Sequence, residues 1–395
     1  MPAPCSTTWR ARCCRSHWAS PMPTATDSMP GRLTRRAALQ CALAWGLGSL
    51  SGMPQAGQAR QPAQWLVSWY HGTQAWAGLW QDGRILRRTP LPARAHQLLE
   101  LPPTRRTGPR MALAVARRPG EYLLRWNPAT GRVQHHHAME DDRFLAGHAV
   151  YSPELETLFT TETDAASGQG LVVARDPRSL QRRFEWASGG VGPHALLWEP
   201  PRAGQPRPTL LVANGGILNL PETGRRKLNL GAMDSNLTRL DAFTGDILGQ
   251  WRLGDPHLSL RHLARAQDGT VGIALQAEHP DRTVRPQAPA LALLDTQGLR
   301  ALPAPTGEAA AHWDGYAGDI ACTGDTFWVT APQAGCLMAW RSNGSAARTT
   351  PLEGVCPVGV ADGEVWALGT RAFQHGIRQA ATERTQWDNH LLHWV

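Results

Sequence analysis

Lysine is almost absent from this chain of 395 residues: Lys227 is the single one, and arginine supplies the other basic side chains. Charged residues of both signs are scarce, at 18% of the sequence. No segment keeps a 3.6-residue apolar period, and no apolar run is long enough to cross a bilayer as a helix. These absences argue against a coiled coil, an acidic disordered chain and an integral membrane segment.

Signature motifs for catalysis and metal binding are missing as well. The sequence has no Cys-x-x-Cys or Cys-x-x-Cys-His, which argues against a thiolate zinc site and a c-type haem. It also has no Gly-x-Ser-x-Gly elbow, phosphate-binding loop or His-Glu-x-x-His. Beyond the first 59 residues only Cys322, Cys336 and Cys356 occur, an odd number that allows at most one disulfide among them.

Positive charge gathers at the N-terminus. The chain carries 40 basic and 32 acidic side chains, a net charge of +8. Residues 1–59 hold six arginines and one aspartate, which leaves 34 basic against 31 acidic side chains, a net +3, for the remainder. A charge this small and dispersed gives no basis for nucleic-acid binding, so no nucleic-acid partner is expected.

The first 59 residues have the order of an export signal. Arg35 and Arg36 form a twin-arginine pair, residues 37–50 are a short apolar run, and residues 55–59 offer small residues for cleavage. This order is typical of a twin-arginine signal peptide, whereas the alternative, a transmembrane anchor, needs about 20 apolar residues. We therefore expect an N-terminal extension and signal peptide at residues 1–59, a single folded domain at residues 60–395, and a periplasmic protein exported by the twin-arginine pathway.

The rest of the chain repeats short apolar runs bounded by Gly, Pro, Asn or Asp. The runs lie at residues 65–70, 111–116, 157–161, 210–213, 271–275, 327–330 and 365–368. Their spacing of roughly 48 residues is in the range of propeller blades. Turn sequences such as Asp241-Ala242-Phe243-Thr244-Gly245 follow the next strand of a blade. The pattern predicts an all-β fold, a seven-bladed β-propeller of the YVTN/WD40-like type; two β-sandwich domains are the alternative, but no linker divides the chain.

A histidine recurs just ahead of four successive runs. His96, His148, His194 and His262 each stand near the start of the predicted innermost strand of a blade. Innermost strands line the central channel, so we expect these histidines at one channel mouth, together with the loops that follow the second strands. Those loops contribute the other candidate ligand-binding residues: Glu162, Asn214, Arg225, Lys227 and Gln276.

Several strings of the sequence carry a family resemblance. They include "GGVGPHALLW", "LLVANGGI", "GRRKLNLGAMDSNLTRLD" and "LSLRHLARAQDGTVGIALQ". Through them the chain resembles a periplasmic propeller family catalogued as a domain of unknown function, over most of residues 62–395. The resemblance implies a seven-bladed propeller with a twin-arginine signal, encoded beside imelysin-type proteins and a di-haem oxidoreductase-like protein in iron-uptake clusters. The resemblance also implies these two kinds of protein as partners. It does not imply any particular enzyme activity.

Three functions follow from these residues. The first is a non-enzymatic binding or scaffold protein of an envelope iron-uptake system, holding a metal, a chelate or a partner at the channel mouth. Imidazole suits iron and other transition metals, with His148, His194 and His262 as the candidate metal ligands and Lys227 and Arg225 as clamps for an anionic chelate. Each histidine taken singly also fits a structural hydrogen bond across to a neighbouring loop.

The second function is a lyase or hydrolase that uses a histidine base with Glu162 or Asp164 at the same mouth. The third is a structural module whose rim holds an imelysin-like partner. A further tract, His135-His136-His137, is expected late in the second blade on a solvated outer edge that faces away from the mouth.

Overall fold

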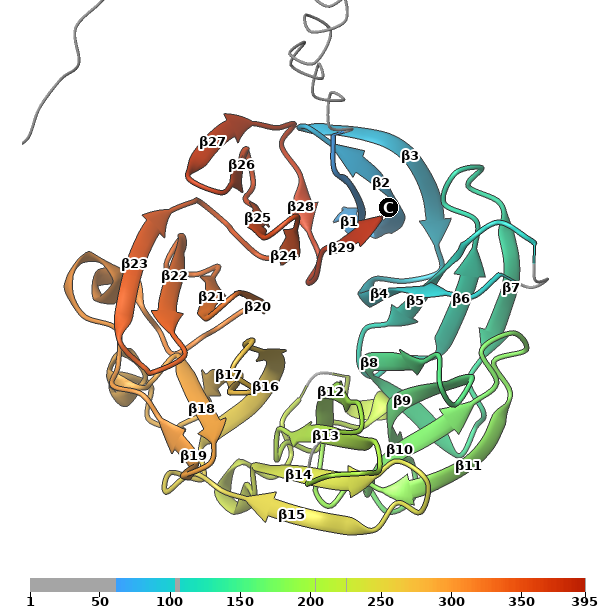
Figure 1. Ribbon diagram of the computed structural model, residues 1–395, viewed down its shortest axis with the longest axis horizontal. Coiled ribbons are helices and arrows are strands. Elements are labelled where there is room, and N and C mark those ends of the chain that lie inside the picture. The colour runs from blue at the N-terminus through green and yellow to red at the C-terminus, as the bar shows by residue number, and fades with distance from the viewer. Residues whose placement is uncertain (1–61, 104–106, 203, 225, 395) are drawn as a thin grey trace, which may run out of the picture. The chain divides into compact units, whose positions relative to one another are not determined.

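The computed structural model describes residues 62–103, 107–202, 204–224 and 226–394. The signal peptide predicted at residues 1–59 lies outside the described residues. From Pro62 onward the chain forms one compact unit of seven antiparallel sheets arranged in a ring (Figure 1). This confirms the predicted seven-bladed β-propeller and excludes the two-sandwich alternative.

Each blade from the second to the seventh is built from four consecutive strands, ordered from the channel outward in chain order. Blade two comprises β4 (Ala95–Leu101), β5 (Met111–Ala116), β6 (Tyr122–Trp126) and β7 (Val133–Ala138); blade three comprises β8 (Arg143–Ser152), β9 (Thr157–Asp164), β10 (Gly170–Arg175) and β11 (Arg182–Ala187); blade four comprises β12 (Pro193–Glu199), β13 (Thr209–Asn214), β14 (Asn236–Asp241) and β15 (Ile247–Trp251).

Blades five to seven continue the pattern around the ring. They comprise β16 (Leu258–Arg265), β17 (Val271–Ala277), β18 (Leu291–Asp295) and β19 (Gly298–Ala301); β20 (Ile320–Thr323), β21 (Thr326–Ala331), β22 (Cys336–Arg341) and β23 (Ala346–Pro351); and β24 (Val358–Ala361), β25 (Glu364–Leu368), β26 (Ala372–His375) and β27 (Arg378–Ala381). Four short 3-10 helices lie in the connections: η1 (Pro221–Thr223), η2 (Leu230–Ala232), η3 (Arg282–Gln287) and η4 (Gly307–His312). No helix among the described residues is both long and apolar enough to span a membrane.

Blade one joins the two ends of the described chain. Its strands β1 (Gln64–His71), β2 (Gln74–Gln81) and β3 (Arg84–Leu91) come from the N-terminal side. Its inner edge is the C-terminal β28 (Gln386–Trp387) and β29 (Leu392–Trp394), which both pair antiparallel with β1. The C-terminal segment therefore closes the ring by completing the N-terminal blade, a choice that the sequence leaves open.

The seven apolar runs are the second strands of the blades, from β1 to β25. Strands β5 and β13 are buried at every position, because both of their faces pack against neighbouring blades. The expected turn chemistry is also present: the Asp241 carboxylate accepts hydrogen bonds from the backbone N–H groups of Phe243 and Thr244, at 2.8 and 3.1 Å. Cys322, Cys336 and Cys356 are free thiols within the described chain.

Candidate functional site

A backbone irregularity places each of the four predicted histidines. The pairing of the innermost strand with its neighbour shifts register across the histidine in every case: between Ala95 and Gln97, Leu145 and Ala149, Pro193 and Leu196, and Leu260 and Leu263. A bulge leaves its extra residues outside the ladder and re-aims their side chains. The same device, repeated in four blades, thus turns four imidazoles away from the sheets.

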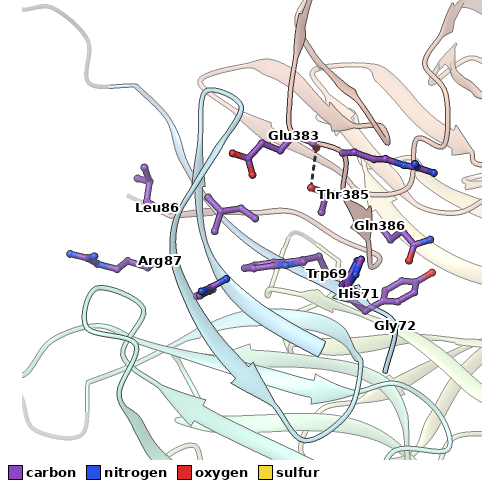
Figure 2. A pocket seen from close by; sticks show the side chains of 12 residues that line it. Trp69, His71, Gly72, Leu86, Arg87, Glu383, Thr385 and Gln386 are labelled. Atoms are coloured by element: carbon purple, nitrogen blue, oxygen red, sulfur yellow. Dashed lines mark hydrogen bonds between the residues drawn. The ribbon is translucent and has the colours of Figure 1, made fainter. Parts of the chain in front are cut away.

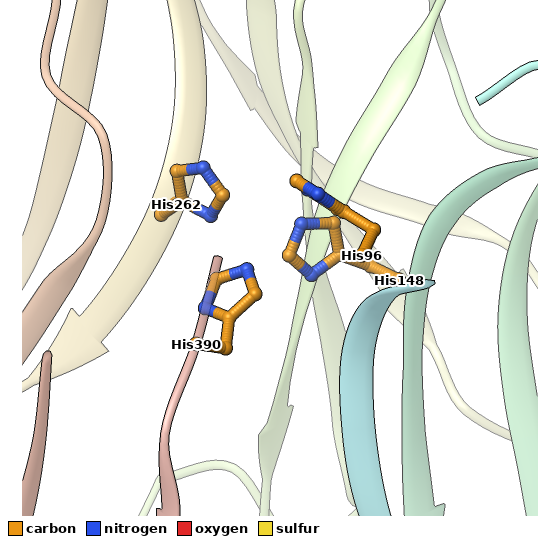
Figure 3. Close-up of side chains that lie close together, drawn as sticks. All are labelled: His96, His148, His262 and His390. Atoms are coloured by element: carbon orange, nitrogen blue, oxygen red, sulfur yellow. The ribbon is translucent and has the colours of Figure 1, made fainter. Parts of the chain in front are cut away.

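The four imidazoles meet in the channel and are joined there by a fifth. Ring centroids lie 4.6 Å apart for His96 and His148, and 4.7 Å apart both for His148 and His194 and for His194 and His262. His390, from the connection between β28 and β29, lies 4.6 Å from His262. Figure 3 shows His96, His148, His262 and His390 around a common space. We call these five residues the histidine cluster.

The backbone makes room for this crowding at two points. A Cβ atom on Gly147 would lie 2.7 Å from the His96 ring, so the glycine before His148 is needed for close approach. His390 has a φ of 72°, in the left-handed region that non-glycine residues rarely adopt. Strained backbone of this kind is often found at functional sites.

The donor atoms lie close enough to serve one ion. One ring nitrogen from each of His96, His148, His262 and His390 falls within 4.8 Å of the others. The Nε2 atoms of His194 and His262 are 3.3 Å apart. Two nitrogens on one tetrahedral zinc ion lie about 3.3 Å apart, because each bond is about 2.05 Å long. His96, His148, His262 and His390 therefore have the spacing of candidate ligands for one metal ion.

Burial keeps the predicted histidines neutral. Loss of hydration lowers the pKa of His96, His148, His194 and His262 well below 6.5, and the neighbouring histidines and arginines act in the same direction. A neutral imidazole has a free lone pair, whereas an imidazolium has none. These four histidines are therefore in the protonation state that metal coordination requires at neutral pH.

Six ring nitrogens of the cluster are buried and have no hydrogen-bond partner among the described residues. They are both nitrogens of His96, Nε2 of His148, Nδ1 of His194, Nδ1 of His262 and Nε2 of His390. A buried polar group without a partner costs about 1–3 kcal/mol, so native proteins rarely keep several in one place. The structural alternative, in which each histidine bonds to a neighbouring loop, does not account for His96.

Asp319 of blade six orients the fifth histidine. Its Oδ1 lies 2.9 Å from Nδ1 of His390, which leaves Nε2 of that ring facing the cluster. The carboxylate is itself fixed by the backbone N–H groups of Ile320, at 2.8 Å, and Val358, at 3.1 Å. A carboxylate that holds the far nitrogen of a histidine is the usual outer partner of a metal-ligating imidazole.

A cavity of about 220 Å³ opens onto the cluster. His96, His194 and His262 form part of its wall. The rest of the lining comes mainly from loops of the same rim: Arg117, Arg118, Lys227, Gln276, Glu278, Arg282, Arg285, Asp314, Tyr316, Gln333 and Asn389. Positive side chains outnumber carboxylates in this lining.

Sequence comparison identifies the family. Residues 89–394 match the family described as a protein of unknown function (DUF1513). The chain belongs to this family. Among curated proteins no relative matches.

One solved structure agrees with the DUF1513 chain in fold, and two others align with lower scores. Hydrazine synthase of Kuenenia stuttgartiensis aligns with a TM-score of 0.54 at 12% identity, over 75% of this chain and 87% of that one. BBS1N, in a complex with ARL6DN, aligns with a TM-score of 0.49 at 11% identity, over 74% of this chain and 80% of that one. Apo AztD from Citrobacter koseri aligns with a TM-score of 0.45 at 10% identity, over 84% of this chain and 98% of that one.

In this DUF1513 propeller the side chain of Glu162 does not lie at the channel mouth, where it was predicted. Its side chain is fully buried, and Arg175 donates to both of its oxygens, at 2.8 and 3.0 Å. Thr160 donates to the same carboxylate, and Arg143 lies 3.8 Å away. Glu162 is thus the centre of an internal ion network, because its side chain packs within the blades.

Asn214 is likewise structural in the DUF1513 chain: it is fully buried, and it bonds to the Ser188 carbonyl and to Asn236, both at 2.9 Å. Gln276 and Lys227 do line the cavity, as expected. Arg225 lies outside the described residues. His135–His137 are on the outermost strand β7, as expected, but His137 is buried and lies 3.2 Å from Arg175, which corrects the solvated edge predicted for it.

Sequence reasoning missed His390 as a cluster member. The signal was available: Asn389-His390-Leu391-Leu392 precedes the inner strand of blade one much as Ala95-His96-Gln97-Leu98 opens that of blade two. The repeat could not be extended to blade one because the closing strand was unassigned. Arg282 and Arg285 were also missed, since they lie on η3, in a connection without a repeat.

Two other features of the DUF1513 chain are weaker candidate sites than the cluster. A groove of about 890 Å³ on blade one is lined by Trp69, His71, Arg87 and Glu383 among others, and none of the predicted site residues lines it (Figure 2). Asp255, His257 and His279 form a second group of metal-type donors at the rim, but Asp255 is already bonded to Nε2 of His279 at 2.8 Å. The histidine cluster is the site where buried donors converge without partners among the described residues.

Proposed function

We propose that this propeller is a non-enzymatic metal-binding protein that holds one divalent transition-metal ion in the histidine cluster. The observation that carries the proposal is the convergence of four histidines, His96, His148, His262 and His390, each with one ring nitrogen within 4.8 Å of the others and each with a buried nitrogen that has no hydrogen-bond partner among the described residues. Imidazole suits zinc, copper, iron and nickel, and a set made only of neutral nitrogens favours these ions over magnesium or calcium.

A role in an envelope iron-uptake system, after twin-arginine export to the periplasm, is part of the proposal. It is supported by the Arg35-Arg36 pair and by the resemblance described above, which also gives an imelysin-like or di-haem oxidoreductase-like protein as the partner. The lyase or hydrolase alternative loses one of its two candidate carboxylates, because that of Glu162 is committed to Arg175, while that of Asp164 accepts hydrogen bonds from Ser167. A scaffold role at the rim is compatible with metal binding.

Calorimetric titration of metal-free protein tests the proposal. We expect one Zn²⁺ or Cu²⁺ per chain, and one Fe²⁺ under anaerobic conditions, with copper bound most tightly. At a metal concentration 1,000 times the Kd, binding should stabilise the fold by about 4 kcal/mol. No bound metal and no shift in Tm with any of the three ions would overturn the assignment.

The Asp319→Asn variant should bind Zn²⁺ about 10- to 100-fold more weakly than the wild type, the usual cost of losing an outer partner of a ligating histidine. The amide no longer attracts the imidazole proton as strongly, while its one oxygen can still accept from the backbone N–H of Ile320 and the bond from Val358 is lost. Asp325→Asn, an exposed position of the same blade with a side chain 58% exposed, is the matched control. Equal affinity for Zn²⁺ in the two variants would show that Asp319 does not support the metal site.

A further inference from the structure

The proposed metal site has a charge imbalance. Its donors are neutral imidazoles, and among the described residues Asp319 is the one carboxylate in contact with the cluster. Arg117 lines the cavity beside three histidines of the cluster, and Arg261, which precedes His262 in the chain, is fully buried. A buried dication beside these arginines would carry uncompensated positive charge, which is costly in a low-dielectric site.

The adjoining cavity adds further positive charge. Arg117, Arg118, Lys227, Arg282 and Arg285 line it, against two carboxylates, Glu278 and Asp314. The same cavity is walled by three histidines of the cluster, so a molecule inside it would contact both the cations and a bound metal ion.

The two carboxylates are already engaged. Glu278 forms ion pairs with both Lys227 and Arg261, so one negative charge is shared by two positive ones. Arg261 is fully buried, and its Nε and Nη1 have no hydrogen-bond partner in the described part of the chain. Asp314 lies 3.5 Å from Arg282.

Two arginines of the lining are incompletely neutralised: Arg285 has no carboxylate partner among the described residues, and Arg117 shares one with Arg94. Arg285 donates from Nε and Nη2 to the backbone carbonyl of His279, at 3.2 and 2.9 Å, and the described residues place no carboxylate within 4.0 Å of it. Arg117 donates to the side-chain oxygen of Asn389 at 3.2 Å and lies 3.5 Å from Asp388, whose other bonds go to Arg94. Both arginines remain able to bind an anion.

The cavity has room for a small organic anion, with a volume of about 220 Å³. Guanidinium groups bind carboxylates in a planar, bidentate geometry, and several arginines around one cavity favour a ligand with several carboxylates.

We propose that the cavity binds a small polycarboxylate that also coordinates the metal ion through one oxygen, so that the protein takes up its metal as an anionic complex. The inference rests on the metal site proposed above. Arg117 and Arg285 would hold the outer carboxylates, while the histidine cluster holds the metal on its other side. The anion neutralises the excess charge of both the ion and the arginines.

Equilibrium dialysis with radiolabelled citrate tests this. Zn²⁺-loaded protein should retain one citrate per chain with its zinc, and metal-free protein should bind citrate at least about 10-fold more weakly, because the metal–oxygen bond is missing. The Arg117→Gln/Arg285→Gln variant, loaded with zinc, should bind citrate about 10- to 100-fold more weakly than the wild type. Arg348→Gln, an exposed arginine on β23, is the control and should behave like the wild type.

The outcomes separate the two proposals. Zinc bound without retained citrate, or zinc stripped from the protein by citrate, would overturn the polycarboxylate inference and leave the metal site intact. Failure of zinc itself to bind would overturn the proposed function. Equal retention of inorganic phosphate would overturn the choice of a carboxylate ligand.

Discussion

The His148→Ala/His262→Ala variant is expected to lose high-affinity metal binding, with the Kd for Zn²⁺ rising by more than about 100-fold. Loss of a single outer partner already costs about 10- to 100-fold, and this variant removes two of the donors that lie within 4.8 Å of one another. The stabilisation of about 4 kcal/mol expected for the wild type at 1,000 times its Kd should disappear with it. Titration calorimetry and thermal unfolding with and without zinc measure both effects.

The metal-free form of this variant should remain folded. His148 and His262 are neutral and hold buried nitrogens without partners among the described residues, so their removal relieves polar burial while it opens a small space. His71→Ala/His136→Ala, which removes two exposed histidines, is the matched control and should keep the wild-type affinity. A histidine-cluster variant that binds zinc as tightly as this control would contradict the site.

The propeller fold could be read from the sequence because its signals are periodic. The second strands are largely buried and so appear as apolar runs, and several turns repeat the same Asp or Asn chemistry. The ring of histidines followed from the same periodicity, since equivalent positions of successive blades converge at one mouth. The periodicity did not predict His390, because blade one is assembled from both ends of the described chain.

The remaining parts of the site depend on side-chain direction and loop conformation. Glu162 and Asn214 stand on second strands near the predicted mouth, but a strand sends alternate side chains to opposite faces, and both of these are buried between protein layers. The cationic cavity is built from connections of unequal length, such as η3, for which no repeat exists. Contacts of this kind leave no periodic pattern in the sequence.

Arg175→Met should destabilise the fold by about 3–5 kcal/mol, the usual cost of leaving a buried charge without its partner. Arg175 and Glu162 are both fully buried, and Arg175 also bonds to Glu140 at 2.9 Å and to the Leu180 carbonyl at 3.0 Å. Removing the guanidinium strands the Glu162 carboxylate, whose pKa burial already raises. Urea unfolding of the metal-free protein measures the loss.

The second substitution of the same pair decides what Glu162 does. Arg175→Met/Glu162→Leu should recover part of the lost free energy of unfolding, because no fully buried charge is left without a partner: Arg143 keeps Asp142 and Glu185, and Glu140 is 28% exposed. Arg182→Met is the control: its partners on the outer face of blade three are 37% and 54% exposed, so its loss should cost less than about 1 kcal/mol. The double variant should bind zinc with wild-type affinity, since this network lies within the blades and the metal donors lie in the channel. A weaker affinity for zinc in the folded double variant would instead show that Glu162 contributes to the metal site.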